Sequence, residues 1–133
     1  MATIFTKIIN GEIPSYKIAE DENYFAFLDI NPVAQGHTLV VPKVEDDYIF
    51  NLSPDYYAGL WKFAQKIAKA QKSAIECKRI GVAVIGLEVP HAHIHLVPLT
   101  KEGDLDFSAN NKKTFAPEIM ESIAEKIRAE LSK

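Results

Sequence analysis

The chain has 133 residues, 47% hydrophobic and 25% charged, and a formal net charge of −3 at pH 7. This length fits one ordinary domain with a buried core, and the composition excludes disordered and collagen-like classes. Acidic and basic residues are mixed without a basic stripe, which argues against nucleic acid as a partner. A small phosphorylated ligand stays compatible with this charge.

Cys77 is the single cysteine, so neither an intrachain disulfide nor a cysteine-based zinc cluster is expected. A lone thiol is typical of a reducing compartment. Residues 1–10 lack the regions of a signal peptide, and no apolar run approaches a membrane span in length. We therefore expect a cytoplasmic protein with no membrane partner.

The first third of the sequence predicts a short helix and three strands, at residues 3–10, 15–20, 23–30 and 37–42. Asn10-Gly11 ends the helix, and the polar pair Asp21-Glu22 is the turn of a hairpin between the first two strands. Residues 31–36 have the proline and glycine that are typical of a turn before the third strand.

A long helix begins at Ser53-Pro54-Asp55, because serine can cap, proline fits the first helical position and aspartate favours the positive end. One apolar face then recurs at steps of three and four residues, formed by Leu60, Phe63, Ile67, Ala70, Ala74 and Cys77. The pattern predicts about seven turns. Cys77 is interpreted as the end of this face, with a reactive thiol as the weaker alternative.

The last third predicts two strands, a polar loop and a closing helix, at residues 80–86, 91–99, 101–114 and from about Pro117. The closing helix has an apolar side made of Met120, Ile123, Ile127 and Leu131. Strand runs, rather than strict alternation of strands and helices, favour an α+β fold with a largely antiparallel sheet. We expect a single domain over residues 1–133.

A functional site is indicated by residues 90–98, which read P-H-A-H-I-H-L-V-P. His91, His93 and His95 stand at every second position, and His37 is the one other histidine. Because side chains alternate along a strand, the three imidazoles should point one way, onto a face that water can hydrate, and the intervening apolar residues onto a helix. Solvated surface histidines are the simplest interpretation, but three in register indicate a site.

Two chemistries suit this cluster. In the first, imidazoles bind zinc or another divalent metal. Three on one strand span about 13 Å and cannot all reach one ion, so this hypothesis needs two of them with His37. In the second, His93 is a nucleophile in phosphoryl or nucleotidyl transfer, with a polar neighbour on each side to stabilise the transferring phosphate. The second hypothesis needs only a regular strand.

H-A-H-I-H-L-V at 91–97 resembles the His-x-His-x-His-x-x signature of the histidine triad (HIT) family of nucleotide hydrolases and transferases. I-F-T-K-I-I-N-G-E-I-P (4–14) is similar to the opening segment of that family. A-F-L-D-I-N-P-V-A-Q-G-H-T-L-V-V-P-K (26–43) resembles its nucleotide-binding strand pair, His37 included. The similar segments cover about residues 4–100 in the family's order.

The resemblance implies a five-stranded antiparallel sheet with a long central helix and a C-terminal helix, paired as a homodimer with a ten-stranded sheet. It implies a purine nucleotide substrate, cleaved at the α-phosphate through a covalent nucleotidyl-histidine on His93, with no metal and no cofactor. The carbonyl of His91 would hold the Nδ1–H of His93. His95 and His37 would contact the phosphate or support the triad.

The nucleotide site implied by the resemblance comprises Phe5, Phe27, Asp29, Ile30, Gly86 and Glu88. The nucleoside would lie near Phe5, Phe27 and Ile30, and Asp29 would accept from the ribose hydroxyls. From the residues alone, the apolar members could equally belong to the core, and Asp29 could cap a turn.

The chain departs from the family's pattern at three places, and these departures bear on which substrate we expect. The opening segment has Thr6 and no cysteine, so the zinc-binding cysteine pair of some relatives is missing and no structural zinc is expected. Leu87-Glu88 replace a Gln-Ser pair of the phosphoramidase branch, and Glu88 could repel an anionic leaving group or favour a cationic amine. The tail after residue 100 differs as well.

Two alternatives to the hydrolase function are a nucleotide-binding regulatory or scaffold protein with little turnover, and a histidine-ligated metalloenzyme.

Overall fold

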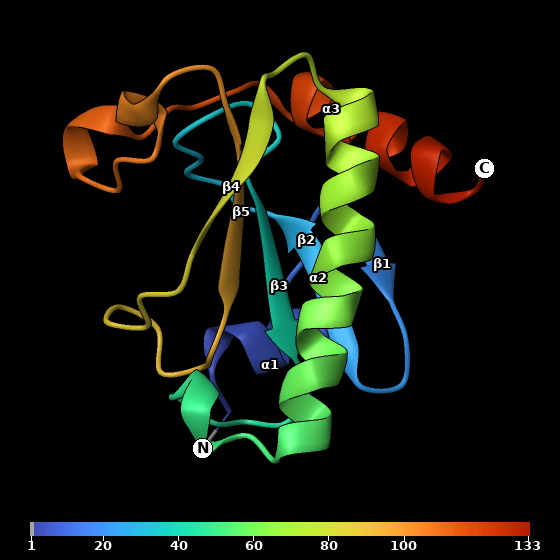
Figure 1. The fold of residues 1–133 in the computed structure, drawn as a ribbon, viewed down its shortest axis with the longest axis vertical. Coiled ribbons are helices and arrows are strands. Elements are labelled where there is room, and N and C mark those ends of the chain that lie inside the picture. Colours follow the sequence, from blue (N-terminus) through green and yellow to red (C-terminus); the bar gives the residue numbers. More distant parts are fainter. Residues whose placement is uncertain (1) are drawn as a thin grey trace.

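Five strands form one sheet in the computed structural model, which describes residues 2–133 (Figure 1). The strands are β1 (Lys17–Glu20), β2 (Tyr24–Leu28), β3 (Thr38–Pro42), β4 (Arg79–Ala83) and β5 (Ile94–Leu99). Their order across the sheet is β1-β2-β3-β5-β4, and every pairing is antiparallel. The predicted α+β class and five-stranded antiparallel sheet are confirmed.

Three α-helices accompany the sheet: α1 (Ile4–Ile9), α2 (Pro54–Ala74) and α3 (Pro117–Leu131). The predicted cap at Ser53 is present, since its hydroxyl accepts from the N–H of Tyr56 at 3.3 Å. The structure adds a cap at the start of α1, where the hydroxyl of Thr3 accepts from the N–H of Thr6 at 3.0 Å. Within residues 2–133, none of the helices combines the length and the apolar character that crossing a membrane requires.

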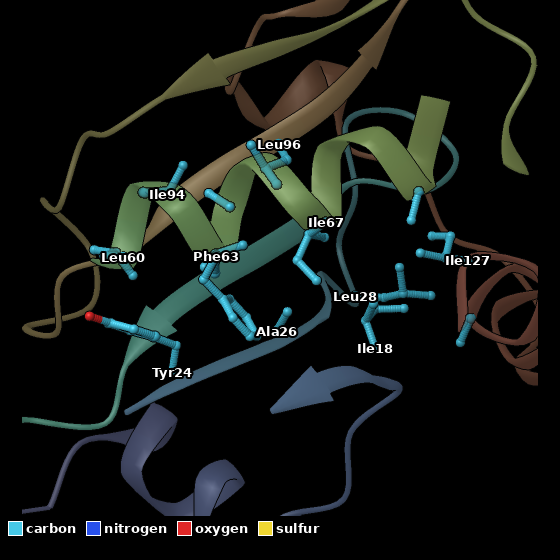
Figure 2. Close-up of a cluster of buried hydrophobic side chains, with 14 of the residues drawn as sticks. Ile18, Tyr24, Ala26, Leu28, Leu60, Phe63, Ile67, Ile94, Leu96 and Ile127 are labelled. Atoms are coloured by element: carbon cyan, nitrogen blue, oxygen red, sulfur yellow. The ribbon is translucent and has the colours of Figure 1, made fainter. Parts of the chain in front are cut away.

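One face of the sheet packs against α2 and α3. In Figure 1, α2 is the light green helix in front of the strands. Figure 2 shows side chains from β1, β2, β5, α2 and α3 meeting in this layer, with Ala26, Phe63, Ile67, Ile94 and Ile127 among those labelled. These five side chains are at most 5% exposed. Burying each large member stabilises the fold by about 1.5–3 kcal/mol, so this layer holds the sheet in place.

The opposite face of the sheet is covered in part by α1. A second buried cluster lies here, made of Phe5, Phe25, Phe27, Leu39 and Val41. The strand residues in it alternate with those of the first cluster, as the pleat of a strand requires. His95 alternates in the same way with Ile94 and Leu96, both of which pack in the first cluster. The site therefore lies on the α1 face, opposite the long helix, as predicted.

Helix α2 is shorter than predicted. It ends at Ala74 after 21 residues, about six turns, and Ile75 is extended with φ −115° and ψ 128°. Cys77 therefore lies beyond the helix, half-buried in the connection to β4. Apolar spacing misled the prediction, because a side chain that packs in a connection can continue the helical period by coincidence.

The last two strands are also shorter than predicted. β4 ends at Ala83 rather than 86, and β5 begins at Ile94 rather than 91. Pairing of β5 with β3 starts only at Ile94, and the N–H of Ala92 donates instead to the carbonyl of Asp46 at 2.6 Å. Of the three clustered histidines, only His95 is therefore part of a strand.

Candidate active site

A cavity of about 380 Å³ lies on the α1 face of the sheet. Nine of the ten residues expected at the site line it: Phe5, Phe27, Asp29, Ile30, His37, Gly86, Glu88, His93 and His95. The tenth, His91, does not. The fold thus brings together residues from the N-terminal and the C-terminal parts of the region that resembles the HIT family.

All four histidines are buried, with exposed fractions between 0% for His91 and 8% for His95. The expectation of a hydrated histidine face was wrong, because α1 and the segment after β5 cover the rings. Burial disfavours the charged imidazolium and lowers the pKa of each ring. With further repulsion from His93, it lowers the pKa of His37 to about 4 and that of His95 to about 3. The cluster is neutral at pH 7.

The hydrogen bonds of His37 and His95 fix their tautomers. The backbone N–H of Val33 donates to Nδ1 of His37 at 3.1 Å, so the proton of this neutral ring is on Nε2. That Nε2–H donates to Nδ1 of His95 at 3.0 Å, which leaves the proton of His95 on its own Nε2. One backbone amide therefore sets the donor and acceptor roles of two successive rings.

His93 has the opposite tautomer. Its Nδ1–H donates to the carbonyl of His91 at 2.7 Å, so Nε2 has a free lone pair. The ring is held between the edge of Phe5, with centroids 5.0 Å apart, and the ring of His95 at 4.8 Å. An unprotonated imidazole nitrogen in this position is a nucleophile or a base.

His91 is held away from the cavity by both of its nitrogens. Its Nε2–H donates to the carbonyl of Pro42 at 2.7 Å, and the hydroxyl of Thr3 donates to Nδ1 at 2.7 Å. The side chain of His91 thus joins α1 to β3, while its backbone carbonyl holds His93. Of the two imidazoles expected beside the nucleophile, only His95 lines the cavity with it.

Asp29 follows β2 and has two carboxylate oxygens in different surroundings. Oδ1 accepts from the N–H of Asn31 at 2.8 Å, the turn cap considered from the sequence. Oδ2 lies 3.7 Å from Nε2 of His37, too far for a hydrogen bond. One ligand atom each from Asp29, His37 and His95 lies within 4.8 Å of the others, so these three could approach one metal ion.

The cavity also has an apolar part, next to His93. The rings of Phe5 and Phe27 meet edge to face with centroids 5.5 Å apart, and Ile30 is 64% exposed at the rim. Gly86 also lines the cavity, with φ +71°, a conformation that favours glycine. A flat aromatic group could pack against these apolar side chains.

The HIT domain family matches residues 10–102, most of the chain. The chain belongs to the HIT family. Among HIT proteins, an uncharacterised HIT-like protein of Borreliella burgdorferi is 39% identical over 116 residues, which cover 82% of this chain and 84% of that one. The adenosine 5′-monophosphoramidase HNT1 of Saccharomyces cerevisiae is 36% identical over 102 residues, 76% of this chain and 65% of that one.

Solved HIT structures share the fold over nearly the whole chain. A Hit-like protein involved in cell-cycle regulation from Bartonella henselae has a TM-score of 0.84 at 36% identity and covers 96% of this chain and 95% of its own. A zinc-bound histidine triad protein of Mycobacterium smegmatis has a TM-score of 0.82 at 30% identity, with 99% and 94% covered. A hypothetical histidine triad nucleotide-binding protein of Sulfolobus tokodaii reaches 0.83 at 29%, with 97% and 91% covered.

Two residues outside the HIT signature segments reach this site from the segment after β5. The ring of Phe107 packs against His95, with centroids 4.6 Å apart, and against His37 at 5.8 Å. Lys112 lines the cavity beside Glu88. Sequence reasoning missed both residues, because residues 101–114 look like an ordinary polar loop, and the lone aromatic in it was the only available signal.

Proposed function

We propose that the chain is a nucleotide-binding hydrolase that cleaves the α-phosphate bond of a nucleoside 5′-monophosphate derivative, a phosphoramidate or a phosphoanhydride. A covalent nucleotidyl-histidine forms on His93. The observation that carries this proposal is the tautomer of His93, whose Nδ1–H is bound by a carbonyl while Nε2 is unprotonated at the cavity. The identity with a yeast adenosine 5′-monophosphoramidase supports the same reaction class.

The first step forms a bond between Nε2 of His93 and the α-phosphorus, and the leaving group departs with the electrons of the broken bond. An amine leaves neutral because the phosphoramidate nitrogen is already protonated in the substrate, and a phosphate leaves as its anion. His93 acquires a positive charge in this step. The carbonyl of His91, 2.7 Å from Nδ1, stabilises that charge. In the second step, water attacks the phosphorus, its proton is released, and His93 regains its lone pair.

His95 is suited to stabilise the transferring phosphate. Its Nε2–H is available as a donor, because its Nδ1 is occupied by His37. A neutral imidazole that donates in a buried site stabilises developing negative charge without a protonation step. His37 contributes by fixing this tautomer, a positioning role.

The nucleoside occupies the apolar part of the cavity in this proposal. The purine packs against Phe5, Phe27 and Ile30, which line that part. Oδ2 of Asp29, which makes no hydrogen bond within residues 2–133, accepts from the ribose hydroxyls. The turn cap uses Oδ1 and the proposed ribose contact uses Oδ2, so the cap does not exclude the ribose contact.

The decisive experiment is hydrolysis of adenosine 5′-phosphoramidate, with acid quenching and intact-mass measurement to detect an adenylated protein. Wild-type protein should turn over and form the adduct. His93→Ala should lose roughly a thousandfold or more in kcat and form no adduct, since the nucleophile is gone. Full activity of His93→Ala would exclude His93 as the nucleophile. Tight AMP binding without turnover by the wild type would support the regulatory or scaffold alternative.

A metal-dependent alternative is favoured by one observation, the convergence of Asp29, His37 and His95. An ion there would compete with the proton on Nε2 of His37 and would break the His37–His95 hydrogen bond. Protein purified without chelators should therefore keep its activity in EDTA and carry less than one metal ion per chain. A stoichiometric ion whose removal abolishes activity would exclude the metal-free mechanism.

The homodimer also belongs to this proposal. β4 is an edge strand, and exposed apolar residues gather on it and just after it: Val82, Val84, Ile85 and Leu87. An exposed apolar edge strand is a template for pairing with a second copy, which would make the ten-stranded sheet. Light scattering after gel filtration should give a dimer mass, and Val82→Lys should shift it toward the monomer. A monomeric wild type at micromolar concentration would exclude the dimer.

A further inference from the structure

The cavity lining has little positive charge to balance the negative charge of a phosphorylated substrate. The lining contains the carboxylates Asp29 and Glu88, and its histidines are neutral at pH 7. Lys112 is the only lysine or arginine that lines the cavity in the described part of the chain. An α-phosphate brought into this site therefore has one cation available to it.

The backbone around Lys112 is held in place over the site. The next residue, Lys113, donates its N–H to the carbonyl of Pro32 at 2.7 Å and its Nζ to the carbonyl of Val33 at 2.7 Å. Phe107, earlier in the same segment, packs on the ring of His95. Lys112 is thus fixed at its base, and it lines the same cavity as His37 and His95.

The ammonium of Lys112 is only weakly engaged. Its Nζ lies 3.9 Å from Oε2 of Glu88, and the two side chains are 35% and 83% exposed. An exposed ion pair at this distance contributes little, because water and salt screen the attraction. A phosphate in the cavity, with up to two negative charges and less exposure to water, would therefore attract the ammonium more strongly than Glu88 does.

We propose that Lys112 is the phosphate-binding cation of this site, and that Glu88, the carboxylate beside Lys112, disfavours nucleotides with a second phosphate. The inference rests on the proposed nucleotide site and adds its charge selectivity. Once Lys112 moves to the α-phosphate, the carboxylate of Glu88 has no cation partner within residues 2–133. It then repels an anionic leaving group and attracts a cationic amine. The site is suited to amine-linked nucleotides.

The first test compares the affinities of AMP and adenosine by calorimetry. Wild-type protein should bind AMP more tightly, and Lys112→Gln should lose about tenfold in AMP affinity while its adenosine affinity is unchanged. Lys112→Arg should restore most of the AMP affinity, and Lys72→Gln, on the exposed last turn of α2, should behave as wild type. Unchanged AMP affinity in Lys112→Gln, or an equal loss for adenosine, would overturn the role of Lys112. A wild type that prefers adenosine would do so as well.

The second test compares ADP with AMP in Glu88→Gln. Removing the carboxylate should raise the affinity for ADP relative to AMP several-fold, and Glu76→Gln, outside the cavity, should not. An unchanged ratio would overturn the role of Glu88. Both tests measure binding alone, so their results are valid even if the wild type hydrolyses no nucleotide. The absence of hydrolysis would contradict the proposed hydrolase activity and not the roles of Lys112 and Glu88.

Discussion

The hydroxyl of Thr3 donates a hydrogen bond to Nδ1 of His91 at 2.7 Å, and the same oxygen caps α1. The first helix and the first histidine of the cluster thus depend on one side chain. Because Phe5 of α1 also packs against His91 and His93, this hydroxyl fixes the cavity wall relative to the proposed nucleophile.

Replacing Thr3 by valine should lower the free energy of unfolding by about 2–4 kcal/mol. The substitution removes the cap, which contributes about 1 kcal/mol, and leaves the buried Nδ1 of His91 without its donor, which costs about 1–3 kcal/mol. Urea unfolding measures the change. Thr3→Ser keeps the hydroxyl and should stay within about 1 kcal/mol of wild type. A valine variant as stable as the serine variant would contradict this role.

Acid should destabilise the protein through its buried histidines. The pKa of His95 is lowered to about 3, so the folded state keeps this ring neutral while the unfolded chain takes up a proton below about pH 6.5. Stability is therefore complete above pH 6.5 and falls as the pH decreases, by about 1.4 kcal/mol per pH unit for each such ring. Urea unfolding at pH 7, 6 and 5 should show this slope.

The contribution of one ring can be isolated with His95→Gln. The fall in the free energy of unfolding between pH 6 and pH 5 should be smaller than in wild type by about 1 kcal/mol or slightly more, because one proton fewer is taken up on unfolding. Ile67→Val is the control, since it removes a buried methyl group and no titrating group. Parallel pH profiles for wild type and His95→Gln would show that His95 is not held neutral.

Phe107→Ala should raise the pKa of His95. Burial is the largest cause of its low pKa, and the ring of Phe107 covers it at a centroid distance of 4.6 Å. An NMR titration of the imidazole resonances measures the shift toward the ordinary value of 6.5. Phe50→Ala, at an exposed position away from the cavity lining, should leave the titration unchanged. The same result for both variants would mean that Phe107 does not shield the ring.

Gln71 should be costly to replace although it lies outside the site. It is fully buried on α2, and its Nε2 donates to the carbonyls of Gly36 at 3.0 Å and Leu96 at 3.1 Å. Gln71→Leu leaves both carbonyls without this donor and should cost about 2–4 kcal/mol in urea unfolding. Gln65→Leu, exposed on the same helix, should change stability by less than about 0.5 kcal/mol. Equal effects would contradict the role of Gln71.

The sequence predicted the sheet and helices where local signals were strong. Ser53-Pro54 marks the start of α2, and alternation places Ile94 and Leu96 toward that helix. The end of α2 was misplaced because Cys77 continues the apolar spacing beyond the helix, and the start of β5 was misplaced because it depends on where a neighbouring strand stops pairing. No single-residue pattern contains that information.

The lining of the site was predicted by resemblance rather than by periodicity, since a buried Phe27 looks the same in a core and in a pocket. The hydrogen bonds among the histidines were beyond sequence reasoning. They depend on backbone groups, such as the N–H of Val33, that any residue but proline supplies. Phe107 and Lys112 were missed for a related reason, because only the path of the chain after β5 brings them to the cavity.

β5 starts only at Ile94, and this late start has a consequence for the orientation of His93. If the strand included His91, the carbonyl of His91 would be hydrogen-bonded to a neighbouring strand, as the carbonyls of β5 are. Because pairing starts at Ile94, the carbonyl of His91 is left to accept from His93. The ring of His93 is oriented by a backbone group that does not take part in sheet pairing. Extending the pairing of β5 from Ile94 back to His91 would take this carbonyl away from His93, and the proposed nucleophile would lose its orientation without a change in any side chain.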